Sequence, residues 1–183
     1  EFKGLRSLER PGLSLPLRAS DFDNPLTSRL YRVQTGGSTG AARRILVDLD
    51  LLEHEAAYHA SFFAAAGPAP RPLAIWHPAP PGAVGIKTAL IQAKLGRPAE
   101  RWFSQSALRE APVRHAAFVH GAIVTASLLG ARIPVPEHTP PSEARRVAAW
   151  LAARRAAGAP AVLVATASGG RIPCWYRGGG TFR

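Results

Sequence analysis

The chain of 183 residues has few sulfur-containing amino acids, with one cysteine and no methionine. The single cysteine, Cys174, excludes an intramolecular disulfide and a zinc site built from several cysteines. No methionine stands at residue 1, and residues 171–183 follow neither the helical nor the strand period. From these two features we expect the sequence to be a fragment of a longer protein.

Long apolar runs are also missing from the sequence. No stretch approaches the roughly 20 apolar residues that a membrane-spanning helix needs, and the first residues do not form a signal peptide. These absences predict a cytoplasmic protein. With 46% hydrophobic and 19% charged residues, the composition is that of a globular domain rather than a disordered chain. The length is enough for one domain with an ample core.

Negative charge is scarce, since 23 Lys and Arg outnumber 12 Asp and Glu and leave a formal net charge of +11. Such an excess of positive charge can serve nucleic-acid binding. Here the basic residues are almost all arginine, scattered along an Ala-, Gly- and Pro-rich chain. No zinc-finger, homeodomain or RNA-recognition pattern accompanies them. Nucleic acid is therefore the least favoured partner.

Hydrophobic periodicity predicts alternating strands and helices after an irregular leader over residues 1–25. A capping box at residues 50–53 is expected to open one helix, and Ser142 is expected to cap the last. The segment 101–104 is either a further strand or a packed turn. The predicted strands are 30–34, 45–47, 73–77 and 161–166, and the predicted helices are 50–66, 84–95, 112–129 and 142–157.

This alternation predicts an α/β fold, a layered open sheet with helical crossovers between its strands. The apolar run at 161–166 is typical of a strand covered on both faces. The helix at 112–129 is apolar nearly all round, so we expect it to be buried. Residues 26–167 are assigned to one domain, and the Gly/Arg-rich tail at 168–183 is predicted to be disordered.

No metal site is predicted. Three pairs of residues have side chains that bind cations in other proteins: Asp21 with Asp23, Glu55 with His59, and His115 with His120. The aspartates are better explained by a solvated loop. The second pair lies one helical turn apart, but no third ligand is near, and an exposed pair is the simpler interpretation. The two histidines of the third pair point to different faces of their helix.

The most distinctive stretch is the glycine-rich loop at residues 35–43, between the first two predicted strands of the domain. Its candidate binding residues are Thr35, Gly36, Gly37, Ser38, Thr39, Gly40 and Arg43. Glycines let consecutive backbone N–H groups approach an anion, hydroxyls add donors, and arginine adds a permanent positive charge. The combination suits a polyphosphate. An ordinary glycine-rich turn between two strands remains the alternative.

Spacing excludes two common phosphate loops. A Walker A loop needs Gly, four residues and then Gly-Lys-Ser/Thr at the start of a helix, and no stretch of the sequence satisfies this. The dinucleotide fingerprint needs Gly-x-Gly-x-x-Gly between a strand and a helix. The three glycines at 36, 37 and 40 miss that spacing, and their loop joins two strands.

The loop at 35–43 resembles the phosphate-binding signature of adenylate-forming enzymes, the acyl-CoA synthetase (AMP-binding) superfamily. The phenylacetate–CoA ligase-like branch is the most similar. The resemblance extends from about residue 17 to about residue 166, and the helix after Asp50 and the strand exit at Trp76-His77-Pro78 also carry it. It implies that Ser38, Thr39 and the loop amides hold the ATP phosphates. It also implies that Arg43 adds charge and that His77 lies near the acyl pocket.

By the same resemblance, the chain is part of the large N-terminal domain of an ATP-dependent acid–thiol ligase, with Mg²⁺ as cofactor and CoA as co-substrate. The expected partners are a nucleotide and a small carboxylic acid. Ala42 departs from the family pattern, which has proline there, and Arg43 stands where lysine is commoner. The later family motifs for adenine, ribose and magnesium and the catalytic lysine do not occur before Arg183. We therefore do not expect catalysis by this chain alone.

Two alternatives stay open. The chain is either this incomplete ligase domain or a non-enzymatic α/β module that binds a nucleotide or a partner through the same loop. Similarly, His77 is either a substrate-binding residue or a half-buried histidine that caps the end of its strand.

Overall fold

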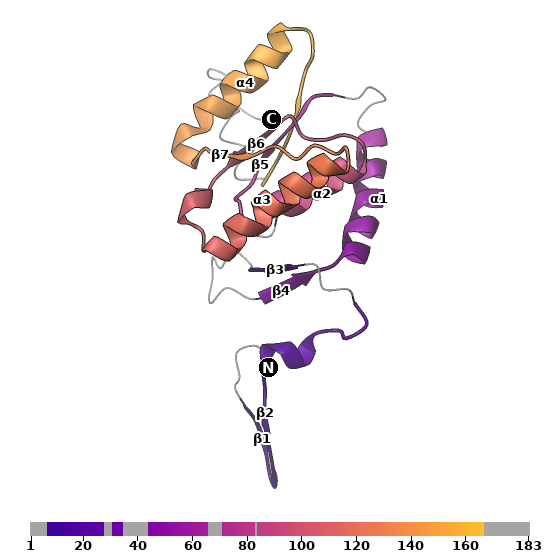
Figure 1. The fold of residues 1–183 in the computed structure, drawn as a ribbon, viewed down its shortest axis with the longest axis vertical. Coiled ribbons are helices and arrows are strands. Elements are labelled where there is room, and N and C mark those ends of the chain that lie inside the picture. The colour runs from indigo at the N-terminus through magenta and orange to yellow at the C-terminus, as the bar shows by residue number, and fades with distance from the viewer. Residues whose placement is uncertain (1–6, 28–30, 35–43, 66–70, 83, 167–183) are drawn as a thin grey trace, which may run out of the picture.

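A computed structural model describes residues 7–27, 31–34, 44–65, 71–82 and 84–166 (Figure 1). The glycine-rich loop at 35–43 and the tail predicted at 168–183 lie outside these residues. The strands are β1 (Ser7–Arg10), β2 (Leu13–Pro16), β3 (Tyr31–Gln34), β4 (Arg44–Val47), β5 (Leu73–Trp76), β6 (Arg101–Ser104), β7 (Pro136–His138) and β8 (Val162–Ala165). The α-helices are α1 (Leu49–Ala65), α2 (Val84–Lys94), α3 (Val113–Leu128) and α4 (Ala144–Ala156). None of the described helices is long and apolar enough to cross a membrane.

Four parallel strands form the central sheet, in the order β7-β6-β5-β8. A helix connects each strand to the next along the chain, so the expected α/β fold with helical crossovers is confirmed. The chain moves outward from β5 through β6 to β7, and then returns to place β8 on the other side of β5. The strand order therefore reverses between β5 and β8. In open α/β sheets, ligands bind at the carboxyl ends of the strands beside such a reversal.

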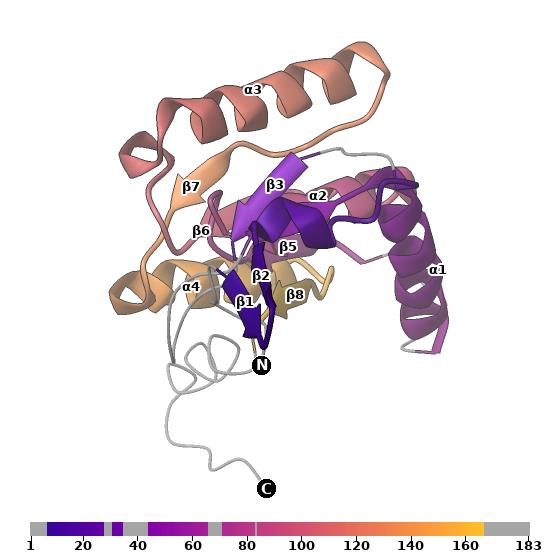
Figure 2. The same ribbon diagram turned by 90° about the horizontal axis from the view of Figure 1, so that it is seen from below.

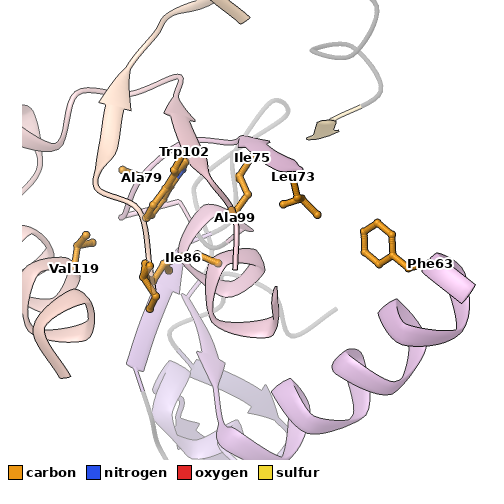
Figure 3. Close-up of a cluster of buried hydrophobic side chains, with 10 residues drawn as sticks. Phe63, Leu73, Ile75, Ala79, Ile86, Ala99, Trp102 and Val119 are labelled. Atoms are coloured by element: carbon orange, nitrogen blue, oxygen red, sulfur yellow. The ribbon is translucent and has the colours of Figure 1, made fainter. Parts of the chain in front are cut away.

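Alternating side chains of the sheet fill two separate cores. Leu73, Ile75 and Trp102 point to the face covered by α2 and α3, where they pack with Ile86 and Val119 (Figure 3). The alternate residues of β5 and β6 point the other way and pack against α4: Ala74, Trp76 and Phe103 against Ala144 and Val147. Figure 2 shows α3 and α4 on opposite sides of the sheet. The two-residue period of the strands thus explains the layered arrangement.

The two strands that flank the glycine-rich loop form a separate antiparallel hairpin. Gln34 of β3 is paired with Arg44 of β4, so the two ends of the 35–43 segment lie side by side. A third core attaches the hairpin to α1 and α2 through Val33, Val47, Leu52, Ala56 and Ile91. Both predicted strands are confirmed.

The N-terminal strands form a second hairpin that extends away from the sheet (Figure 1). Gly12 makes its turn with a φ of 75°, a conformation that glycine adopts without strain. Asp21 then accepts the backbone N–H of Arg18 at 2.7 Å, and Asp23 binds the guanidinium of Arg44 at 2.5 Å. The two aspartates therefore serve a turn and an ion pair.

Two helix starts differ from those predicted. Helix α1 begins at Leu49, and its N-cap is Asp48, whose carboxylate accepts the N–H of Leu51 at 2.6 Å. The capping box predicted at 50–53 is therefore two residues too late. Helix α4 begins at Ala144 after a 3₁₀ turn at Pro141–Glu143, and its N-cap residue makes no side-chain cap, so Ser142 does not cap it. At α1 a residue two positions earlier makes the cap, and at α4 a preceding 3₁₀ turn takes the place of a cap.

The predicted burial of the helix at 112–129 is wrong. Val119 is the one buried residue of α3, whereas Val113, Val124 and Leu128 are exposed. The helix packs one face on the sheet, and within the described residues nothing covers its outer face. Strand β8 was expected to be covered on both faces, but its residues are half-buried because it lies at the edge of the described sheet.

Three described strands are not among those predicted, and one alternative is resolved. The segment 101–104 is strand β6 rather than a turn. The predicted strands do not include β1, β2 or β7. Strand β7 has three residues, Pro136–His138, and pairs with β6. A segment this short and polar carries no hydrophobic alternation, so its pairing depends on contacts made after the sheet has formed.

Candidate anion-binding site

A cavity of about 470 Å³ lies beside the β3–β4 hairpin. Three segments distant in sequence supply its walls: the hairpin, the loop after β5 and the first turns of α3. Among the described residues, those that line it are Arg32, Val33, Arg44, Pro80, Arg114, His115 and Phe118. The cavity therefore combines apolar surface with several cationic groups.

The hairpin places two of the arginines on one face. Arg32 is opposite Leu46 and Gln34 is opposite Arg44, so Arg32 and Arg44 are diagonal neighbours on the same side of the ladder. Asp23 holds the Arg44 guanidinium at 2.5 Å. Arg44 follows the glycine-rich loop directly, so the cavity lies at the base of that loop.

The third arginine and a histidine come from α3. Pro112 is the N-cap residue of this helix, and Arg114 and His115 lie in its first turn. The Nε of Arg114 lies 3.4 Å from Nε2 of His115. Desolvation lowers the pKa of His115 below its ordinary value, and the charge of Arg114 lowers it further. The helix N-terminus carries a partial positive charge, so all of these groups favour an anion.

The charge of the cavity is poorly compensated. Within the described residues no carboxylate forms an ion pair with Arg32 or Arg114, whereas Arg44 is paired with Asp23. Arg32 and Arg114 thus bring two positive charges to the cavity. Arginine binds phosphate and carboxylate oxygens through paired N–H groups. The arrangement is thus suited to an anion with more than one negative charge.

The predicted loop residues, Thr35 to Gly40 and Arg43, lie outside the described residues, so the structure fixes the two ends of their segment. Arg32, Arg114 and His115 were not predicted as site residues. One signal was present in the sequence, because a cation in the first turn of a helix is locally unfavourable. Arg114 just after Pro112 therefore indicates a role that helix stability does not explain.

His77 follows β5 at the carboxyl edge of the sheet, but it does not line the cavity. It is buried, with 5% of its surface exposed, rather than half-buried as expected. Among the described residues its Nδ1 has no hydrogen-bond partner, and its backbone carbonyl accepts the indole N–H of Trp102 at 2.9 Å. Burial lowers the pKa of its imidazole, so the neutral form is favoured.

The other candidate ligands are used within the fold. Glu55 forms an ion pair with Lys87 at 2.8 Å, and Nδ1 of His59 lies 3.1 Å from Nε2 of Gln92. Both side chains are half-buried against α2, which corrects the expectation of an exposed pair. Across the described ranges no group of three His, Cys, Asp or Glu residues is placed to hold a metal ion.

Comparison with known proteins gives no relative. No protein-family model matches the chain, and no curated protein or solved structure matches it.

Proposed function

We propose that the chain binds the phosphates of a nucleotide at the β3–β4 hairpin, as part of the adenylation domain of an acid–thiol ligase. The observation that carries the proposal is the cavity at the base of the 35–43 loop. It brings Arg32, Arg44 and Arg114 together where a loop rich in glycine and hydroxyl groups begins and ends. Guanidinium groups and backbone N–H donors are the groups that proteins use to hold phosphates.

In the proposed reaction, a carboxylate attacks the α-phosphate of ATP, and pyrophosphate leaves with its electron pair. A thiol such as that of CoA then attacks the acyl-adenylate, and AMP leaves. Ser38, Thr39, Arg43 and the loop amides would hold the phosphates, and His77 would lie near the acid. Fixed donors and cations would stabilise the negative charge that develops on phosphate oxygens.

Mg²⁺ would enter this reaction together with ATP. The described residues offer no cluster of three acidic or imidazole ligands to hold the ion by themselves. The family motif that supplies an acidic magnesium ligand is also not found in the sequence. The chain alone is therefore proposed to bind nucleotide without completing the reaction.

The second candidate is a non-enzymatic α/β module that uses the same cavity to bind a nucleotide. Pyrophosphate exchange into ATP, measured with a panel of aryl and fatty acids, tests for the ligase reaction. We expect no exchange by the chain alone, and nucleotide binding without exchange is expected of both candidates. Exchange that depends on an added acid would exclude the module and would contradict the proposal that the chain alone does not complete the reaction.

Isothermal titration of ATP into the chain tests the binding step. The parent should bind ATP, and two variants should lose most of this affinity: the double variant Thr39→Ala, Arg43→Ala in the loop, and Arg32→Gln in the cavity. Loss of a charge-assisted hydrogen bond of about 1.5–3 kcal/mol predicts a decrease of about 10- to 100-fold. Arg145→Gln is the matched control, since this exposed residue lies on α4, across the sheet. Equal affinity in all four proteins would reduce the loop to a turn.

A further inference from the structure

We propose that Arg114 and His115 of α3, together with Arg32 of β3, form a second anion subsite that is separate from the 35–43 loop. This subsite takes a doubly charged phosphate group, and protonation of His115 increases its affinity. The subsite deepens the proposed nucleotide site, and the identity of its natural ligand rests on that proposed function.

The subsite is built by elements that do not belong to the loop motif. Arg114 and His115 enter the cavity from the start of α3, and Arg32 enters it from β3. Val119, one turn further along α3, is buried with Trp102 in the core, so the start of the helix is fixed relative to the sheet. The two α3 side chains therefore reach the cavity from a helix that is anchored in the core.

The charge of the cavity selects the kind of anion. The two guanidinium charges of Arg32 and Arg114, with which no described carboxylate forms an ion pair, match a dianionic phosphate group better than a single carboxylate. The other described lining residues are apolar: Val33, Pro80 and Phe118 lie beside the cations. A phosphate attached to an organic body, such as a phosphate monoester or the terminal phosphate of a nucleotide, matches both features.

His115 adds a charge that responds to pH. The groups that face it are Arg114 on its own helix, Arg32 on β3, and Arg44 on β4 with its partner Asp23. Desolvation and the neighbouring cation keep the pKa of His115 below its ordinary value. A bound dianion reverses this balance because it stabilises the imidazolium, so binding takes up a proton.

The direction of the pH dependence follows from this linkage. Affinity is lowest well above both pKa values of His115, where the ring is neutral with and without ligand. It rises as the pH falls through the higher pKa of the bound state, and it levels off below the lower pKa of the free state. Phosphate esters also change charge near pH 6, whereas sulfate stays a dianion throughout this range. Sulfate is therefore the probe that isolates the contribution of His115.

The experiment is titration calorimetry of the whole chain with sulfate, from about pH 5.5 to about pH 8, where histidine changes its charge. We expect the affinity for sulfate to increase about tenfold as the pH falls. His115→Gln should remove this increase while weak binding persists. Arg114→Gln should lower the affinity about 10- to 100-fold at every pH. His120→Gln is the matched control, because His120 lies exposed on another face of α3 and does not line the cavity.

Each outcome bears on the subsite. A pH profile of His115→Gln equal to that of the parent would overturn it, and so would an absence of sulfate binding by the parent. Thermal unfolding of each variant checks the fold, and Arg32→Gln gives a second test of the subsite if the α3 variants do not fold.

Inorganic phosphate, AMP and ATP, titrated in parallel, distinguish a simple phosphate group from a nucleotide. Retention of sulfate binding with no binding of ATP would refute the proposed function and leave the subsite in place. Binding of ATP without a His115-dependent sulfate profile would support the proposed function and refute the subsite.

Discussion

Trp102 donates its indole N–H to the backbone carbonyl of His77 at 2.9 Å, and both residues are buried. Trp102 lies in β6, and His77 directly follows the neighbouring parallel strand β5, in which Ile75 is the register partner of Trp102. The bond satisfies a carbonyl at the carboxyl edge of the sheet, where the strand ladder has ended. It therefore fixes the path of the chain as it leaves β5 towards the cavity.

Trp102→Phe should destabilise the protein by about 1–3 kcal/mol, because it removes the indole donor and leaves the buried carbonyl of His77 without this partner. Urea unfolding measures the change. Trp150→Phe is the matched control, since Trp150 is half-buried at the edge of the α4 core, and its smaller burial predicts a cost below about 1.5 kcal/mol. Equal losses in the two variants would show that ring size, rather than the hydrogen bond, sets the cost.

Gly85 and Gly121 both lie in helices, but replacing each with alanine should have opposite effects on stability. A Cβ on Gly85 would lie 2.5 Å from the carbonyl oxygen of Pro78 and 2.6 Å from Cζ2 of Trp102. Backbone and a buried ring must then move, so Gly85→Ala should destabilise by about 1–3 kcal/mol. A Cβ on Gly121 meets nothing within 4 Å, so Gly121→Ala should stabilise by about 0.5–1 kcal/mol. Thermal unfolding of both variants is the test, and changes of the same sign would contradict the packing described around Gly85.

Much of the architecture could be read from the sequence because the apolar periods are strong. The run at 73–77 and the helix at 84–95 were predicted close to the observed β5 and α2, and Gly96 ends α2 with a φ of 65° as expected of a helix-stop glycine. The failures have physical causes. Composition alone predicted burial of α3, but burial depends on what packs against a helix, and periodicity does not contain that information.

The candidate site also has a part that the sequence predicts and a part that it does not predict. The loop at 35–43 can be predicted from its local composition, because its glycines and hydroxyl side chains lie within a few residues of one another. The cavity depends on Arg32, Arg114 and His115, which come from distant segments and meet when α3 crosses over the sheet. A spatial cluster of this kind leaves no pattern in a single sequence. What the sequence shows of such a cluster is single cations near the ends of strands and helices.

The two faces of α3 predict a contrast in stability. Val119 is completely buried against the sheet, whereas Leu128 is 82% exposed. Val119→Ala removes two buried methyl groups and should cost about 2 kcal/mol. Leu128→Ala removes more carbon but should change stability by less than about 0.5 kcal/mol. Urea unfolding at low protein concentration measures both. A large loss for Leu128→Ala would mean that the outer face of α3 is covered in solution.

Burial of His77 predicts that stability falls in mild acid. Its pKa lies below the ordinary value of 6.5 in the folded protein, so the unfolded chain binds the proton more tightly. The free energy of unfolding should therefore be highest above pH 6.5 and decrease as the pH falls from 6.5 towards the folded-state pKa. His115 contributes in the same direction, because its pKa is also lowered. The test is accordingly a comparison of variants at each pH.

His77→Gln keeps a polar side chain of similar length but does not titrate, so it should unfold with a weaker pH dependence than the parent. Urea unfolding at about pH 7.5 and about pH 5.5 brackets the range over which the unfolded histidine takes up its proton. His54→Gln, at an exposed position on α1, is the matched control and should retain the full dependence. A pH dependence in His77→Gln equal to that of the parent would show that the imidazole of His77 binds its proton as tightly in the folded protein as in the unfolded chain, and would contradict the predicted effect of burial.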